Sequence, residues 1–166
     1  MSTFKPIIIH FKWDRENFLK AFNNAYNFEF KNSIRRYIGW FFIAMTQFGV
    51  VFALKGGRVA LLMLSTILVV YWYYIKKLMV KKRVLKEFEK SPLKDKVINI
   101  KIGKDTIIQD GESISWDNID AVVPSGDDIL LYINKRAYFI PFGAFDSIEE
   151  KSRFKALAKE KGKLYV

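Results

Sequence analysis

Tyr37–Ile75 reads YIGWFFIAMTQFGVVFALKGGRVALLMLSTILVVYWYYI, in which only the four residues KGGR separate two uncharged apolar runs. The runs, 37–54 and 59–75, hold eighteen and seventeen residues. At about 1.5 Å of rise per residue, a helix of that length just crosses a hydrocarbon core of about 30 Å. We therefore predict a transmembrane helical hairpin within residues 35–78. The alternative, two helices buried inside a soluble domain, requires other elements to cover them on every side.

Small residues in the first run predict close packing between the two helices. Gly49 and Ala53 are four positions apart, so they share one helix face and let a partner backbone approach it. Packing within the hairpin is the plain interpretation of this spacing. A homodimer contact through the hairpin is the alternative.

Basic residues concentrate at the outer ends of the hairpin and are sparse in its turn. By the positive-inside rule, this distribution places both termini in the cytoplasm. Tyr and Trp residues collect at the same ends, as is typical of the lipid headgroup layer. We expect contact with the membrane interface and its anionic lipids from Arg35, Arg36, Lys76, Lys77, Lys81, Lys82 and Arg83.

The segments that flank the hairpin predict further helices and one strand. Residues 1–34 contain an alternating run at Pro6–Lys12 and then an amphipathic helix with Asp14 as its N-cap. That helix either packs on the cytoplasmic domain or lies in the membrane interface. Residues 79–92 continue the helical pattern of the second run as a basic juxtamembrane helix.

Residues 96–166 switch from helical to alternating periodicity. Asp110-Gly111 and Asn134-Lys135 are typical of tight turns between antiparallel strands. A capping box that starts at Asp146 or Ser147 then opens a final helix. The predicted fold class is an α+β membrane protein with a C-terminal antiparallel β-meander capped by a helix.

The composition argues against several classes of chemistry. The chain has no Cys and a single His, which removes disulfides, thiol nucleophiles and His/Cys metal sites. His10 lies in an alternating run and is expected on a sheet face. Asp127-Asp128, the nearest approach to a catalytic pair, follows Pro-Ser-Gly and is typical of a solvated turn. Since catalytic motifs are also absent from the sequence, we predict no enzymatic activity, no metal and no cofactor.

The charge is unevenly distributed along the chain. The net charge is +11, yet the stretch 97–147 contains eight acidic and four basic residues. This acidic surplus opposes binding of nucleic acid and favours a basic partner. Trp116 either packs between sheet and helix or contributes to a binding pocket. The partner surface that we expect comprises Trp116, Asp117, Asp127 and Asp128.

Three motifs in the C-terminal segment carry a family resemblance. They are SWDNI at Ser115–Ile119, ILLY at Ile129–Tyr132 and FIPFGAF at Phe139–Phe145. Together with the preceding hairpin, they resemble the bacterial YcxB-like family. The resemblance implies a cytoplasmic domain similar to pleckstrin-homology folds and a multi-pass protein of the bacterial inner (cytoplasmic) membrane.

Three functions are compatible with these features. The first is a non-enzymatic, membrane-anchored binding or regulatory module whose cytoplasmic domain engages a protein or an anionic lipid. The second is an immunity-type protein that neutralises a bacterial toxin by direct binding at the membrane. The third, a nucleic-acid binder, is opposed by the acidic strands, which lack an interleaved basic and aromatic face. We expect membrane lipids and a protein as partners, and no nucleic acid.

Overall fold

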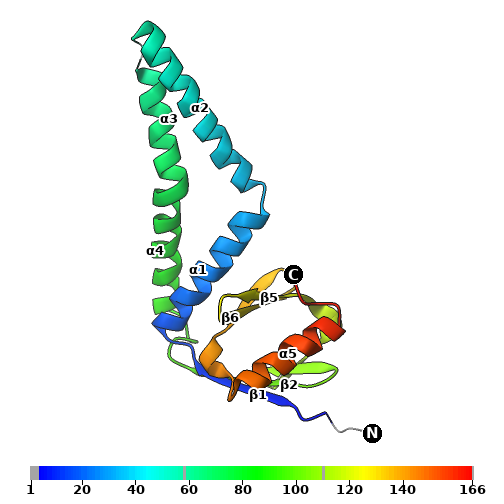
Figure 1. Cartoon of the computed structure of the whole chain (residues 1–166). Helices are drawn as coiled ribbons and strands as arrows, with labels where there is room; N and C mark the ends of the chain where they lie inside the picture. Colours follow the sequence, from blue (N-terminus) through cyan, green and yellow to red (C-terminus); the bar gives the residue numbers. More distant parts are fainter. Residues whose placement is uncertain (1–3, 58, 110, 166) are drawn as a thin grey trace. The chain divides into compact units, whose positions relative to one another are not determined.

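The computed structural model of the chain describes residues 4–57, 59–109 and 111–165. Two of the predicted turns include a residue outside this set, namely Arg58 in the hairpin and Asp110 before Gly111. The described chain combines helices with antiparallel sheets, which confirms the predicted α+β class (Figure 1).

The chain divides into two compact units. One unit combines the chain up to Ala25 with the chain from Pro92 onwards, and the other is Tyr26–Ser91. The helix α1 (Arg15–Asn32) begins in the first unit and ends in the second. We refer to them as the sheet unit and the helical unit.

The first sheet of the sheet unit is antiparallel and has the strand order β1-β2-β3-β4. Its strands are β1 (Ile7–Lys12), β2 (Val97–Ile102), β3 (Thr106–Gln109) and β4 (Glu112–Ser115). Ile9 of β1 is fully buried and pairs with Ile100 of β2. The N-terminal strand thus belongs to the C-terminal sheet. The sequence pattern, in which 1–34 and 96–166 are separate segments, does not contain this pairing, because periodicity identifies strands but not their partners.

The second sheet has the order β5-β6-β7 and is also antiparallel. Its strands are β5 (Ile119–Ser125), β6 (Asp128–Ile133) and β7 (Arg136–Ile140). Asn134 and Lys135 connect β6 to β7 with φ angles of 50° and 63°. Positive φ at both central residues is what a type I′ turn requires, and a tight turn was predicted for this dipeptide. The Asp120 carboxylate fixes the turn further, since it accepts a hydrogen bond of 2.6 Å from the Lys135 N–H.

The C-terminal helix α5 (Ile148–Glu160) packs on the core that the two sheets share. Ser147 is its N-cap, because the Ser147 hydroxyl accepts a hydrogen bond of 3.2 Å from the Glu150 N–H. Phe154 of this helix is fully buried, and its ring centre lies 6.1 Å from that of Trp116. The Trp116 indole N–H donates to the Gly103 carbonyl at 3.2 Å. Trp116 is therefore a core residue, the first of its two predicted roles.

The helical unit contains two helices that are long and apolar enough to cross a membrane. The first is α2 (Arg35–Gly56). The second is a continuous helix from Ala60 to Glu89, which comprises α3 (Ala60–Val70), the π-helical turn η1 (Tyr71–Ile75) and α4 (Lys76–Glu89). Figure 1 shows α2 and α3 leading into the turn that connects them.

Close contact between α2 and α3 is centred on small side chains. Gly49 is buried against the backbone of Leu62, and Gly39 is buried against the ring of Tyr73. Ser65 is fully buried, and its hydroxyl donates to the Leu61 carbonyl at 2.8 Å. A hydroxyl satisfied within its own helix is compatible with apolar surroundings. The hairpin therefore packs through the glycine positions of α2.

Candidate functional site

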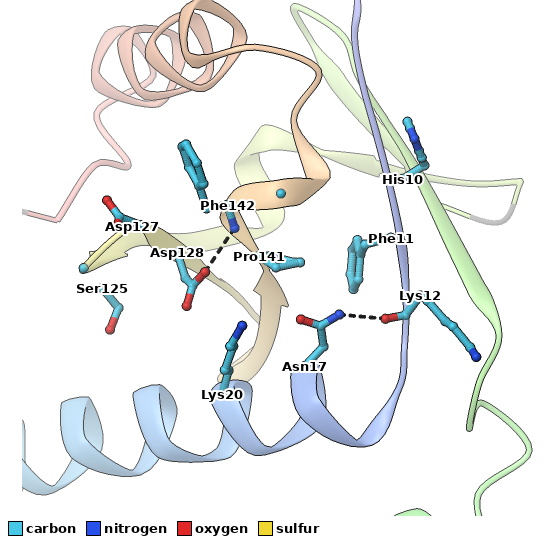
Figure 2. A pocket seen from close by; sticks show the side chains of 12 residues that line it. His10, Phe11, Lys12, Asn17, Lys20, Ser125, Asp127, Asp128, Pro141 and Phe142 are labelled. Atoms are coloured by element: carbon cyan, nitrogen blue, oxygen red, sulfur yellow. Dashed lines mark hydrogen bonds between the residues drawn. The ribbon is translucent and has the colours of Figure 1, made fainter.

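The sheet unit contains an open cleft of about 670 Å³ (Figure 2). The cleft forms where β1 diverges from the segment that follows β7. Ile9 still forms a bridge with Phe145, but beyond it His10–Lys12 and Pro141–Gly143 lie on opposite sides of the cleft. The short helical turn η3 (Phe142–Ala144) holds the second of these sides.

The first turns of α1 form another wall of the cleft. The helix starts at a defined point because the Asn17 N–H donates to the Asp14 carboxylate at 2.9 Å. The Asn17 side-chain amide donates to the Lys12 carbonyl at 2.9 Å and ties α1 to β1. Asn17 and Lys20 are three residues apart on one helix face, and Figure 2 shows both pointing toward the cleft.

Asp128 joins three segments that surround the cleft. One of its carboxylate oxygens accepts a hydrogen bond of 3.0 Å from the Phe142 N–H, and the other accepts one of 3.1 Å from the Asn24 side chain. The half-buried Asp128 thus connects β6, η3 and α1. Asp127 next to it is exposed. The prediction of a solvated turn therefore describes Asp127, whereas Asp128 has a structural role that its sequence context did not indicate.

The two lysines of the cleft each pair with a carboxylate that lies outside its lining. The Lys20 ammonium lies 2.8 Å from the Glu16 carboxylate. This hydrogen bond and charge raise the pKa of Lys20, with smaller contributions from Asp128 and Asp14. Lys12 pairs with Asp95 at 3.3 Å. The cleft therefore offers cations and carboxylates of nearly balanced charge rather than a strong field of one sign.

The lining combines polar groups with apolar surface. Phe11 and Pro141 are buried beneath the opening, and Phe142 is exposed at its rim. Within residues 4–57, 59–109 and 111–165, no group of three or more His, Cys, Asp or Glu side chains converges to hold a metal ion. Chemically, the cleft can receive a side chain or small polar group through hydrogen bonds and apolar contact.

The partner surface predicted from the sequence does not form one patch. Trp116 is buried, while Asp117 is exposed and has its N–H bonded to the Ser115 hydroxyl at 3.2 Å. Both precede β5, whereas Asp127 and Asp128 follow it. An extended strand of 7 residues separates the two pairs by about 23 Å, at about 3.3 Å per residue.

The predicted basic residues divide into two groups in the helical unit. Near the start of α2 and the η1–α4 junction, cations contact aromatic rings: the Arg36 guanidinium lies 5.3 Å from the Tyr37 ring centre and the Lys76 ammonium 3.7 Å from that of Trp72. Farther along α4, Arg83 pairs with Glu87 at 3.3 Å. Arg35 and Lys77 belong to the first group, and Lys81 and Lys82 belong to the second.

Sequence reasoning did not identify the cleft. His10 was expected only on a sheet face, where it lies exposed with Nδ1 4.0 Å from the Asp146 carboxylate. Asn17 and Lys20 lie in no motif, and Phe142 lies in the FIPFGAF stretch, which indicated a family but no ligand. The missing information was the pairing of β1 with β2, which brings the start of α1 beside the β5–β6 turn.

No curated protein and no solved structure significantly matches the chain. A protein-family model does match part of it, from the last residue of β2 into α5. This part includes Trp116, Asp117 and the stretch Phe139–Phe145, the motifs on which the family resemblance was based. Over residues 102–158 the chain is thus similar to the family described as YcxB-like protein, which confirms the resemblance predicted from the sequence.

Proposed function

We propose that the chain is a non-enzymatic binding module anchored in the bacterial inner membrane. In this proposal α2 and α3 span the bilayer, both termini are cytoplasmic, and the sheet unit binds a partner at the inner surface. The observation that carries the proposal is the large apolar surface that the hairpin leaves uncovered.

That surface surrounds the helices on the sides that do not touch each other. Phe48 is 64% exposed, Leu54 is 82% exposed and Ile67 is 63% exposed. Apolar area in water costs roughly 25 cal/mol per Å², so a row of such side chains requires a lipid or protein cover. The basic residues at one end of the hairpin favour lipid as that cover.

The topology of the sheet unit supports our proposal that its fold is similar to that of pleckstrin-homology domains. Two antiparallel sheets, β1-β2-β3-β4 and β5-β6-β7, enclose one core, and α5 packs against it. In this arrangement the helical unit is an insertion between β1 and β2. Such a topology would hold both ends of the hairpin at the same side of the membrane, where the sheet unit folds.

The sheet unit as a whole has sixteen basic and fourteen acidic residues, but its strands carry a local acidic surplus, which favours a protein with a basic surface over anionic lipid as their ligand. The stretch 97–147 carries eight acidic residues against four basic ones. Like charges oppose close approach to anionic headgroups, whereas a basic protein is attracted. The cleft supplies a recess for one side chain of that protein. An immunity-type role, in which the basic partner is a toxin, is the second candidate that this acidic surplus favours.

Affinity capture from detergent-solubilised membranes with the tagged full-length chain tests the proposal. Gly143→Trp places a large side chain at the rim of the cleft, where a Cβ meets nothing within 4 Å. Ser113→Trp on β4, also exposed, is the matched control. We expect the wild type and the control to retain the same basic protein and the Gly143 variant to lose it. Equal retention by all three chains would contradict a role for the cleft.

A further inference from the structure

The end of the helical unit that lies away from its turn gathers cations around aromatic rings. The Lys77 ammonium donates to the Asn27 side-chain carbonyl at 3.1 Å and lies 5.6 Å from the Tyr26 ring centre. The Lys76 ammonium lies 3.7 Å from the Trp72 ring centre. The contacts of Lys77 hold the second half of α1 against the η1–α4 junction. Lys77 already has a hydrogen-bond acceptor, whereas the Lys76 ammonium, among the residues that the structure describes, contacts a ring face.

A small hollow of about 20 Å³ opens beside this junction. The residues that line it come from the end of α1, the first residue of α2 and the first residue of α4: Tyr26, Glu29, Phe30, Arg35 and Lys76. Among the described residues, neither Arg35 nor Lys76 forms an ion pair with a carboxylate. Arg35 and Lys76 share the hollow with one carboxylate, that of Glu29, so its lining keeps a net positive charge that suits an anion.

Tyr26 adds a neutral hydrogen-bond donor to the hollow. Burial raises the pKa of Tyr26 above its ordinary value of 10.0, and the positive charge of Arg35 opposes this shift only in part. The phenol is thus protonated at physiological pH. Tyr26 lines the hollow together with the two cations.

The position of the hollow along the hairpin suits a lipid headgroup. Arg35 is the first residue of α2, whose 22 residues reach to the turn. A helix of that length spans about 33 Å, close to the thickness of the hydrocarbon core. If the hairpin spans the bilayer, as proposed above, the hollow lies at the cytoplasmic headgroup layer. The exposed apolar surface of the hairpin begins directly beside it.

We infer that this hollow binds the phosphodiester group of an anionic phospholipid, with one phosphate oxygen between Arg35 and Lys76 and the Tyr26 hydroxyl as a further donor. The charges of Arg35, Lys76 and Glu29 sum to a single positive charge, which matches the single negative charge of a phosphodiester. The hollow admits little more than one oxygen, so the acyl chains lie outside it along the hairpin. This assignment rests on the proposed membrane anchorage.

Native mass spectrometry of the full-length chain in detergent micelles tests the assignment. The micelles contain equal amounts of phosphatidylglycerol and phosphatidylcholine, and the lipid retained on the protein is identified by mass. The double variant Arg35→Gln/Lys76→Gln removes both cations, and Lys101→Gln/Lys104→Gln in the sheet unit, at two exposed positions, is the control with the same change in charge. Tyr26→Phe removes only the hydroxyl. Limited proteolysis checks that each variant is folded.

We expect the wild type and the Lys101/Lys104 control to retain phosphatidylglycerol selectively. The Arg35/Lys76 variant should lose about tenfold of this selectivity, and Tyr26→Phe should lose a smaller part. Equal losses in the two charge variants would overturn a specific site, as would equal retention of both lipids by the wild type. Displacement of the lipid by millimolar inorganic phosphate would overturn the lipid assignment in favour of a soluble phosphate. Sedimentation of the same preparations without detergent separates these results from a failure of membrane anchorage, in which the chain remains in the supernatant.

Discussion

A Cβ atom built on Gly49 of α2 would lie 2.7 Å from the Cα of Leu62 in α3, so these two helices are in direct backbone contact. We predict that Gly49→Ile separates them and destabilises the hairpin by about 1–3 kcal/mol, because overpacking forces the backbones apart. Thermal unfolding of the full-length chain in detergent measures the loss. Gly56→Ala is the control, since a Cβ there meets nothing within 4 Å.

The same variant distinguishes hairpin packing from the homodimer alternative. If Gly49 and the half-buried Ala53 formed a dimer contact, Gly49→Ile would change the mass of the particle in detergent and leave the thermal transition of the monomer unaltered. We expect the opposite: an unchanged mass and a lower transition temperature.

The link between Asp128 and Phe142 is predicted to hold the cleft in shape. Asp128→Ala removes acceptors from the Phe142 N–H and from Asn24, which should cost about 1–3 kcal/mol of stability. Hydrogen exchange followed by mass spectrometry should show faster exchange in the peptide that contains Phe142. Asp127→Ala, one residue away and exposed, should leave that peptide unchanged. Similar exchange in both variants would exclude this role for Asp128.

Because Lys20 pairs with Glu16, we predict that the stability of the fold falls at alkaline pH. The pKa of Lys20 is raised above its ordinary value of 10.5, so the pair stabilises the fold below pH 10.5 and ceases to do so as the pH rises through the folded-state pKa. Glu16→Gln should return the pKa of Lys20 toward 10.5, since Glu16 is its main cause. NMR titration of the labelled Lys20 side chain measures its titration midpoint in the wild type and in the Glu16→Gln variant. Identical midpoints in the wild type and the Glu16→Gln variant would show that Glu16 does not raise the pKa of Lys20.

Two substitutions of Trp116 distinguish how much packing and hydrogen bonding each contribute to the stability of the sheet unit. Trp116→Phe keeps a ring beside Phe154 but loses the N–H donated to Gly103, at an expected cost of about 1 kcal/mol. Trp116→Ala also opens a cavity and should cost about 3–5 kcal/mol. Chemical denaturation of the full-length chain in detergent compares the two. A nearly neutral Trp116→Ala would mean that this side chain is not part of the core.

Most local elements could be predicted because their signals are local. Alternation in 97–102 and positive-φ residues at Asn134-Lys135 depend only on neighbouring positions, and so does the Ser147 cap. The π-helical turn at Tyr71–Ile75 was not predicted. A π-helical turn changes the hydrogen-bond register of a helix without changing its apolar composition.

The sequence predicted the helices and strands around the candidate site better than it predicted the site itself. Its walls come from β1 and α1 on one side and from the β5–β6 turn and η3 on the other, segments that lie on either side of the helical unit in the sequence. Nothing in the local pattern of His10 or Asn17 indicates that Asp128 and Phe142 lie opposite them. The cleft is formed by segments that are distant in the sequence and not by a local motif. The periodicity of a single sequence does not reveal which distant segments lie together.

Cysteine labelling in intact bacteria tests most directly whether the hairpin spans a membrane with both termini in the cytoplasm. The chain has no native cysteine, so Gly56→Cys in the hairpin turn and Ser152→Cys on α5 each give a single label site. We predict that a membrane-impermeant maleimide labels the Gly56 variant in cells with a permeabilised outer barrier and an intact inner membrane, and labels the Ser152 variant only after lysis. Labelling of Ser152→Cys before lysis, or protection of Gly56→Cys until lysis, would contradict this prediction.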